Sequence, residues 1–538
     1  MEEEGARRTI TREKQTALDW IDANRQRLSQ FHLLIWDFAE PAWREYRSAA
    51  AYVELLRREG FTVEEGSGGM PTAFMATWGQ RPRPKGPVLG AYAEYDAVPG
   101  NSQQAVPYRA PRAGLHPYAP GHTDPHSALG VGALAGVLAA RAAMERHGLA
   151  GTLRFFGEPA EKVCGSKPVH AAKGYYDGVD AFISYHPWWT NTTVWDTQCG
   201  SYWSCVFTFE CVEPETWVDP ALLAFPGHPH AIPRAPAALD AVSLMITMTE
   251  HTREGMYANT GTWTLNEVIM VAGQATADNL PPKIGQIQYA WRSPNLGIQQ
   301  QIYKVLENNA RHAAAVAHCI VHVRWVSKTR VGLTNHVLAD ATYQNLELVG
   351  PPVFDEDARA FGRAIQKNLQ IEPMDDPFTA RCQALVPPRE QEAELRRGLP
   401  EWQKNFTSDD YVEYTWHAPS VRLYTGRPMM RRPHDWSHWA HNALNGVPAA
   451  IDPTWLVAGK TIGLTLVDLL MDGSLVAAAR DEFERRTGGG VGGDSWVAPL
   501  LPADFAPPVD LRWPEYIQTR RGFEWWLPTT THFGTRLS

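Results

Sequence analysis

The sequence lacks several patterns that mark common classes of protein. Its six cysteines are scattered without any Cys-x-x-Cys pair, which argues against a zinc ribbon or a thioredoxin-type redox site. It has no Gly-x4-Gly-Lys-Ser/Thr phosphate loop and no basic run, and its formal net charge is −9, so neither nucleotide nor nucleic-acid binding is expected. The first residues are acidic and no apolar run reaches the length of a membrane span. We therefore expect a cytoplasmic protein with reduced thiols and no membrane contact.

Length and composition set the number of domains to expect. The chain has 538 residues, more than one hydrophobic core usually organises, so we expect at least two domains. Tryptophan is abundant, with 21 copies, many of them after residue 400. These late tryptophans indicate either core and subunit packing or an aromatic wall for an aromatic or apolar substrate.

Strands and helices alternate in the first 200 residues. A long Ala-rich helix from Ser127 to about His147 lies among strand-like apolar runs at 88–92, 152–156 and 181–185. This alternation predicts βαβ units, and therefore an α/β catalytic domain with a mostly parallel mixed sheet flanked by helices.

The pattern changes near residue 200 and later returns. The order β-α-β-β-α-β over residues 201–326 predicts a ferredoxin-like α+β domain inserted into the α/β domain. We therefore divide the chain into a first catalytic part (1–200), the insert (201–326), a second catalytic part (327–472) and a C-terminal extension (473–538). The extension is rich in large apolar residues, so we expect it to wrap the body or a partner subunit.

Side chains that can bind metal follow the predicted strands. The segment GHTDPHS at 121–127 carries Asp124 and His126, where a loop enters the long helix. Glu161 follows the next strand, and His186 ends the strand after that. Because the carboxyl ends of parallel strands meet at one edge of a sheet, we expect these groups to form a hydrolytic metal site. The alternative for Asp124 is a helix cap.

These motifs resemble those of the zinc-dependent aminoacylase and carboxypeptidase superfamily of di-metal amidohydrolases, in particular its branch that contains the p-aminobenzoyl-glutamate hydrolase B-subunit. The strand end AEYDAVPG at 93–100 matches a segment whose Asp orients a metal-ligating side chain, which implies that role for Asp96. GHTDPHS matches a segment that usually reads GHxCGHN. The resemblance implies that His126 is a ligand and that Asp124 replaces a cysteine bridging two metals, a role that a carboxylate can also fill.

The third landmark of this family is Pro-Ala-Glu-Glu after a strand, and this chain reads PAEK at 159–162. The resemblance implies that Glu161 is the general base that takes a proton from water. Lys162 stands where the family has a metal-ligating glutamate, and an ammonium group has no lone pair for a metal. The second metal is then absent, or held by other residues, or replaced by the charge of Lys162 beside the substrate. The alternative is that the Lys162 side chain points to solvent and has no role in the site.

The remaining ligands implied by the resemblance are histidines. His186, followed by proline, matches a strand-end ligand on the same metal as His126. The last ligand lies near the C-terminus of the catalytic domain, where this chain offers His417, His434, His438 and His441. We take His438 as the first candidate and His417 as a replacement.

The insert carries three further candidates. In the family this domain dimerises and sends a histidine into the partner's active site, which the segment GHPHA at 227–231 implies for His230. The segment DNLPP at 278–282 resembles a family turn whose Asn holds the reaction intermediate, so Asn279 has that role or is only a turn residue. Arg292 grips a substrate carboxylate or is only a surface residue of a strand.

Taken with the resemblance, these features predict an enzyme, a metal-dependent amidohydrolase. Its substrate would be a small N-acyl amino acid or dipeptide-like molecule, with an aromatic group if tryptophans line the pocket. We expect a homodimer through the insert and one or two divalent ions, zinc or manganese, per chain. Two alternatives stay open: a mono-metal deaminase-type hydrolase of a C–N bond, and a non-catalytic scaffold in a two-subunit hydrolase.

Overall fold

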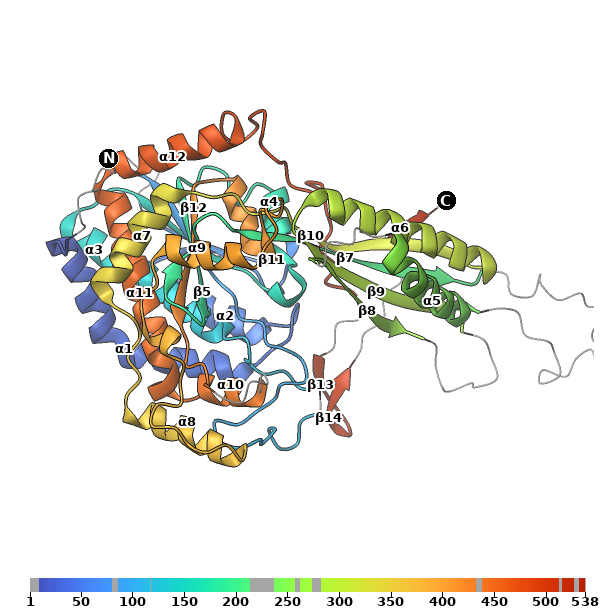
Figure 1. Ribbon diagram of the computed structural model, residues 1–538, viewed down its shortest axis with the longest axis horizontal. Helices are drawn as coiled ribbons and strands as arrows, with labels where there is room; N and C mark the ends of the chain where they lie inside the picture. Colours follow the sequence, from blue (N-terminus) through green and yellow to red (C-terminus); the bar gives the residue numbers. More distant parts are fainter. Residues whose placement is uncertain are drawn as a thin grey trace, which may run out of the picture.

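A computed structural model describes residues 9–79, 86–116, 118–212, 237–256, 262–272, 282–431, 438–511, 515–526 and 532–537. Two large sheets organise these residues, and Figure 1 shows them in separate parts of the molecule. One sheet is mixed and flanked by helices, and the other belongs to an α+β unit. The expected fold class is therefore confirmed.

Seven strands form the first sheet, in the order β1-β2-β4-β3-β5-β12-β6. Their bounds are β1 Thr62–Glu65, β2 Phe74–Gly79, β3 Val88–Ala93, β4 Thr152–Gly157, β5 Ala181–Trp188, β6 Thr192–Thr193 and β12 Ser420–Gly426. The four central strands β4, β3, β5 and β12 are parallel, and the strands outside them pair antiparallel. The carboxyl ends of these four strands therefore share one edge of the sheet.

The long helix predicted in the first half is α3 (His126–His147), and it lies in the core. Small or apolar residues occupy nearly every side of α3, as expected of a buried helix. It packs against α1 (Arg12–Phe38) and α11 (Pro448–Met471). Gly136 allows the close approach of α11, because a Cβ there would lie 2.6 Å from the side chain of Ile462. Burial of α3 fixes its first residue, His126, at the sheet edge.

Two of these core helices are also long and apolar enough to cross a membrane by length and composition alone. They are α3 and α11, and 89% and 72% of their apolar windows are buried inside the fold. The sequence-based expectation that no segment reaches the length of a membrane span was therefore wrong, because these two helices stay apolar on average despite scattered polar residues. Such burial is typical of the core helices of a folded domain.

The remaining helices of the first part cover the sheet and connect its strands. They are α2 (Tyr46–Arg58), α4 (Ser166–Ala172), α7 (His336–Val349), α8 (Glu356–Asn368), α9 (Pro388–Arg397), α10 (His438–Asn445) and α12 (Gly473–Thr487).

The second sheet has the order β15-β10-β7-β9-β8, with β11 added beside β7. Its strands are β7 Cys199–Glu210, β8 Thr264–Val271, β9 Ile284–Ser293, β10 Ile320–Lys328, β11 Phe406–Ser408 and β15 Thr535–Leu537. Helices α5 (Ala238–Met256) and α6 (Leu296–Val316) pack against each other and against β7 and β9. The chain order β7-α5-β8-β9-α6-β10 is the predicted β-α-β-β-α-β order.

The C-terminal extension packs on the body of the molecule. Its last strand, β15, pairs antiparallel with β10, so the chain end joins the second sheet. Leu501 and Leu511 are buried in a cluster with residues of both parts of the chain. Arg324 of β10 also forms an ion pair with Asp510 of the extension. A separate hairpin is formed by β13 (Glu515–Thr519) and β14 (Gly522–Trp526).

Candidate metal centre

Side chains from four segments converge at the carboxyl edge of the parallel strands. Asp96 follows β3, Glu161 follows β4, and His186 lies near the end of β5. Asp124 and His126 lie at the start of α3. The structure thus brings together five of the residues selected from the sequence, because parallel strands present their ends to the same space.

The two histidines of this group are oriented by their Nδ1 atoms. Nδ1 of His126 lies 2.7 Å from Oδ1 of Asp96, and Nδ1 of His186 lies 2.7 Å from the carbonyl oxygen of Pro187. Because both oxygens accept, Nδ1 carries the proton and Nε2 keeps a lone pair in the neutral ring. Nε2 of His186 lies 3.3 Å from Oδ1 of Asp124, and Nε2 of His126 lies 3.6 Å from Oδ2. Lone pairs that face carboxylates so closely require a cation, so this donor set fits a divalent metal ion.

A proton is the competitor of that metal ion at His126. Burial and Lys162 lower the pKa of this imidazole, but the carboxylates of Asp124, Asp96 and Glu94 outweigh them and raise the pKa to about 9. A metal ion that binds Nε2 has to displace this proton, which links metal binding to proton release.

Lys162 points into the centre. Its Nζ lies 2.6 Å from Oδ2 of Asp124 and 2.6 Å from Oε2 of Glu161, and its backbone N–H donates to Oδ2 of Asp96. Burial lowers the pKa of Lys162, but the carboxylates of Asp124 and Glu161 outweigh burial and hold the pKa well above its usual value. Burial raises the pKa of Glu161, but the Lys162 ammonium outweighs it and lowers the pKa to about 2. The alternative of a solvent-facing Lys162 therefore does not fit the structure.

The loop that carries Glu161 and Lys162 is held in an unusual backbone conformation. Ala160 (φ 59°) and Cys164 (φ 48°) flank the short turn Glu161–Val163 and adopt left-handed conformations. Such conformations cost about 1–3 kcal/mol each in residues other than glycine, so other contacts must hold them. Glu45 supplies one: its buried Oε1 accepts the backbone N–H of Ala160 at 2.8 Å. Strained backbone of this kind is common where a side chain must be aimed at a site.

A buried ion cluster that the sequence-based prediction missed lies behind the two histidines. Nζ of Lys167 lies 2.6 Å from Oε1 of Glu94 and 2.6 Å from Oδ1 of Asp410, and none of the three is more than 1% exposed. Burial lowers the pKa of Lys167, but the carboxylates of Asp410 and Glu94 outweigh burial and hold the pKa well above its usual value. Glu94 belongs to the AEYDAVPG motif, so its position was a signal. Asp410 is 243 residues from Lys167, and no local pattern predicts their contact.

A cavity of about 260 Å³ opens beside the centre. Asp124, Glu161, Lys162 and His186 line one part of it. The remaining wall mixes polar and apolar residues and includes six aromatic side chains, Trp188, Trp189, Trp195, Phe406, Tyr411 and Tyr424. Among the late tryptophans that the structure describes, none lines this cavity, and Trp416 and Trp455 are buried. The late tryptophans therefore form no part of this cavity among the described residues, and the tryptophans that line it come from the end of β5 and the segment after it.

Arg292 reaches the same cavity from the second sheet. It lies on β9, and its guanidinium stands 5.2 Å from the ring centre of Tyr202. A second arginine in the wall, Arg422, is paired with Asp409 and donates to Ser184. Arg292 is therefore the arginine better placed to meet an anionic group of a bound molecule.

The histidine candidates near the end of the catalytic domain fall in different places. His417 precedes β12, in which Ser420 lies opposite Phe182 and Tyr424, four positions later, lies opposite His186. Four residues of strand span about 13 Å, so His417 lies toward the opposite edge of the sheet. There its Nδ1 contacts Oδ1 of Asp177 at 3.3 Å. A ligand role for His417 does not fit this placement.

His438 is closer to the centre. It begins α10, and its carbonyl oxygen accepts the hydroxyl of Thr123 at 3.0 Å, one residue before Asp124. Its backbone is thus held beside the loop that carries Asp124. His230, Asn279 and His434 lie outside the described residues.

Comparison with known proteins finds relatives across most of the chain. The model of Peptidase family M20/M25/M40 matches residues 90–445. The p-aminobenzoyl-glutamate hydrolase B-subunit from Escherichia coli (strain K12) is 27% identical over 487 residues, which cover 87% of this chain and 94% of that protein. Xaa-Arg dipeptidase of Mus musculus is 24% identical over 356 residues, or 64% of this chain and 73% of that protein.

A solved structure has a similar fold. The aminobenzoyl-glutamate utilization protein from Klebsiella pneumoniae matches with a TM-score of 0.50 and 15% sequence identity. The match covers 81% of this chain and 98% of that one. The likeness extends over both the mixed sheet and the inserted unit.

Proposed function

Because the chain belongs to the peptidase family M20/M25/M40, we propose that it is a metal-dependent amidohydrolase acting on a small N-acyl amino acid or dipeptide-like molecule. The proposal depends on the convergence of two imidazole Nε2 atoms and the carboxylate of Asp124 beside a cavity whose wall includes His186, Asp124 and several aromatic side chains. That arrangement suits metal-assisted hydrolysis, because a substrate in the cavity would lie beside both the ion and a carboxylate base.

We propose that Asp124, His126 and His186 hold one divalent ion, zinc or manganese, per chain. Such an ion, when bound, polarises the scissile carbonyl and lowers the pKa of a water molecule. The Lys162 ammonium, between Asp124 and Glu161, supplies the positive charge that a second ion would bring. His438 remains a candidate for a further ligand, because its backbone is held beside the loop of Asp124.

Glu161 takes the proton from the attacking water in this proposal. Its carboxylate lines the cavity and is ionised at neutral pH, because the Lys162 ammonium lowers its pKa. The proton then passes from Glu161 to the leaving nitrogen. Asp96 acts through its neighbours, because its two oxygens hold the ring of His126 and the backbone N–H of Lys162.

The walls of the cavity indicate the class of substrate. Trp188 and Tyr424 stack with ring centres 5.5 Å apart, and Trp189 meets Trp188 edge to face. Flat apolar walls of this kind favour an aromatic acyl or amine group. Arg292, on the same cavity, would bind the carboxylate of an amino-acid part.

We further propose a homodimer that forms through the inserted unit. Strand β8 ends the order of the second sheet, and Val268 and Ile269 on it are about half exposed. His230 of one chain would then complete the partner's site, and Asn279 would hold the reaction intermediate. A cytoplasmic location fits the six free thiols.

One observation favours a second candidate function. The Lys162 ammonium is paired with the two carboxylates that would face a second ion, which favours a site with one metal ion. A mono-metal site also suits a deaminase-type hydrolase that releases ammonia. The two functions differ in product, since an amidohydrolase releases a carboxylic acid and an amine.

The test is an assay of metal-stripped protein reloaded with Mn²⁺ or Zn²⁺. The substrates are N-acyl amino acids with aromatic or aliphatic acyl groups, p-aminobenzoyl-glutamate among them, and both free amine and ammonia are measured. We expect metal-dependent release of the amino acid, faster for aromatic acyl groups. A Glu161→Gln variant should be inactive, whereas Glu65→Gln, at an exposed carboxylate on β1, should behave as wild type. Metal-loaded protein that cleaves none of these amides would contradict the proposal.

A further inference from the structure

Glu94 lies against the proposed centre but is not among the three ligands proposed above. It directly follows β3 and is 1% exposed. Its Oε1 accepts from Nζ of Lys167 at 2.6 Å. Its Oε2 is buried and makes no hydrogen bond to any residue within the described ranges. A buried carboxylate oxygen without a donor is costly, so this atom needs a cation beside it, either a metal ion or the proton that competes with the metal for His126.

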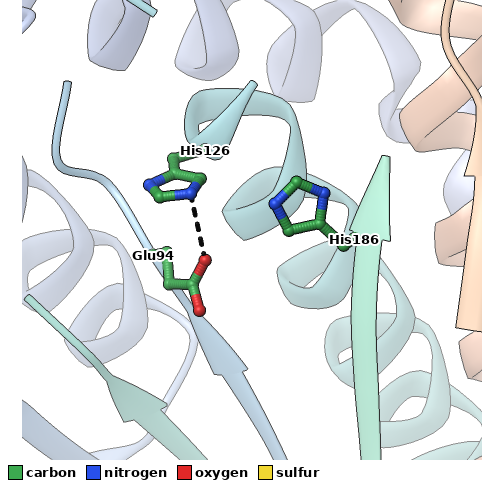
Figure 2. Close-up of side chains that lie close together, drawn as sticks. All are labelled: Glu94, His126 and His186. Atoms are coloured by element: carbon green, nitrogen blue, oxygen red, sulfur yellow. Dashed lines mark ion pairs between the residues drawn. The ribbon is translucent and has the colours of Figure 1, made fainter. Parts of the chain in front are cut away.

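Oε2 of Glu94 faces Nε2 of His126 (Figure 2). Oε2 of Glu94 lies 3.3 Å from Nε2 of His126, and this nitrogen is also buried without a hydrogen bond to the described part of the chain. Figure 2 shows Glu94, His126 and His186 around one space, at the end of β3, the start of α3 and the end of β5. The ligand atoms of these three side chains all lie within 4.8 Å of one another.

The separation between Glu94 and His126 fits two ligands of one ion, and the ligand atom of His186 lies within 4.8 Å of both. Metal bonds to imidazole nitrogen and carboxylate oxygen are about 2.0–2.2 Å long, so neighbouring ligand atoms on one ion lie about 3.0–3.5 Å apart. The distance from Glu94 to His126 and the distance from His186 to Asp124 are both 3.3 Å. Two imidazoles and one glutamate also form an established ligand set of catalytic zinc sites.

We propose that Glu94 is a metal ligand, so that Glu94, His126 and His186 hold the ion on the side of the centre away from Lys162. The two oxygens of Asp124 face different cations: Oδ1 faces His186 and the proposed metal ion, and Oδ2 is paired with the Lys162 ammonium. This inference rests on the proposed function and adds Glu94 to the ligands of the ion that His126 and His186 hold.

The ion cluster behind Glu94 fixes its direction. Lys167 is fully buried between Glu94 and Asp410, and this contact leaves Oε2 of Glu94 as the oxygen turned toward the histidines. Lys167 is thus a positioning residue: it neutralises one oxygen and orients the other. Asp410 keeps Lys167 paired when Glu94 is neutral, so a change at Glu94 leaves the buried ammonium with a carboxylate.

The experiment compares metal affinity in Glu94→Gln and Asp410→Asn. Each substitution removes one carboxylate from Lys167, but only the first removes the proposed ligand. The affinity of the metal-stripped full-length protein for Mn²⁺ and Co²⁺ is measured by calorimetry, and the visible spectrum of bound Co²⁺ reports the ligand set. Residues that only orient a ligand cost about 10–100-fold in metal affinity. We therefore expect a loss of more than about 100-fold for Glu94→Gln and a smaller loss for Asp410→Asn.

Glu94→Asp guards against loss of folding, because it keeps the charge on a side chain one methylene shorter. It should bind metal with intermediate affinity and shift the Co²⁺ spectrum. Equal affinity and equal spectra for wild type and a folded Glu94→Gln would overturn the inference and leave the proposed function standing. A wild-type protein that binds no divalent ion would overturn the proposed function itself.

Discussion

Replacing Lys162 tests whether its ammonium excludes a second ion. Nζ lies 2.6 Å from both Asp124 and Glu161, the carboxylates that would face a second metal. A divalent ion about 4 Å from the ammonium would be repelled by about 8 kcal/mol at an effective dielectric constant of about 20. That energy corresponds to roughly a 10⁶-fold loss of affinity. The wild-type protein should therefore bind one ion per chain at micromolar metal concentrations.

Lys162→Glu removes the ammonium and supplies a carboxylate, so the number of bound ions should rise from one toward two per chain. Lys162→Met is the matched control, because it removes the charge without adding a ligand. It should bind the second ion only at about millimolar concentration. Metal content after dialysis, measured by mass spectrometry, and calorimetric titration give both numbers. Two tightly bound ions in the wild-type protein, or one in a folded Lys162→Glu variant, would refute the reasoning.

Three further predictions concern the base, the dimer and acid stability. Glu161→Gln should keep its metal and lose about 10²–10⁴-fold in turnover, since an amide cannot take the proton, and near-normal turnover would show another base. Mixing inactive Glu161→Gln with inactive His230→Ala should restore activity through one complete hybrid site, whereas demonstrated subunit exchange without recovery would count against a shared site. Burial lowers the pKa of His32 to about 3. As the pH falls below about 6.5, His32 is therefore protonated in the unfolded chain before it is protonated in the folded protein, and the free energy of unfolding should fall by about 2 kcal/mol between pH 7 and pH 5. Burial lowers the pKa of His122 to about 3 as well, so urea unfolding should show an acid loss that is smaller by about 2 kcal/mol in His32→Gln than in the wild-type protein; an equal loss in both would contradict it.

The parts of the site that were predicted from sequence are those that follow strand ends. Asp96, Asp124 and Glu161 each stand a few residues from a strand or helix boundary that apolar patterning reveals. Parallel pairing then brings them together without further information. Apolar patterning also predicted the β-α-β-β-α-β order of the second sheet.

The parts that were not predicted depend on contacts between distant segments. Lys162 was left with several possible directions, because only the folded loop shows that its side chain turns toward Asp124. The role of Glu94 depends on Lys167, and Lys167 in turn depends on Asp410 far along the chain. His417 lies near the ligands in motif order but precedes β12, which places it toward the other edge of the sheet. Side-chain direction and strand polarity therefore decided what residue type alone could not.

The proposed centre holds a single ion, on the side away from Lys162. Anomalous diffraction from crystals of the unmodified protein grown with Mn²⁺, measured on both sides of the metal absorption edge, tests this placement most directly. We expect one strong peak per chain, within bonding distance of Glu94, His126 and His186, with the Lys162 ammonium still between Asp124 and Glu161. Two peaks of full occupancy, or one peak at the position of the ammonium with Lys162 turned away, would contradict the claim.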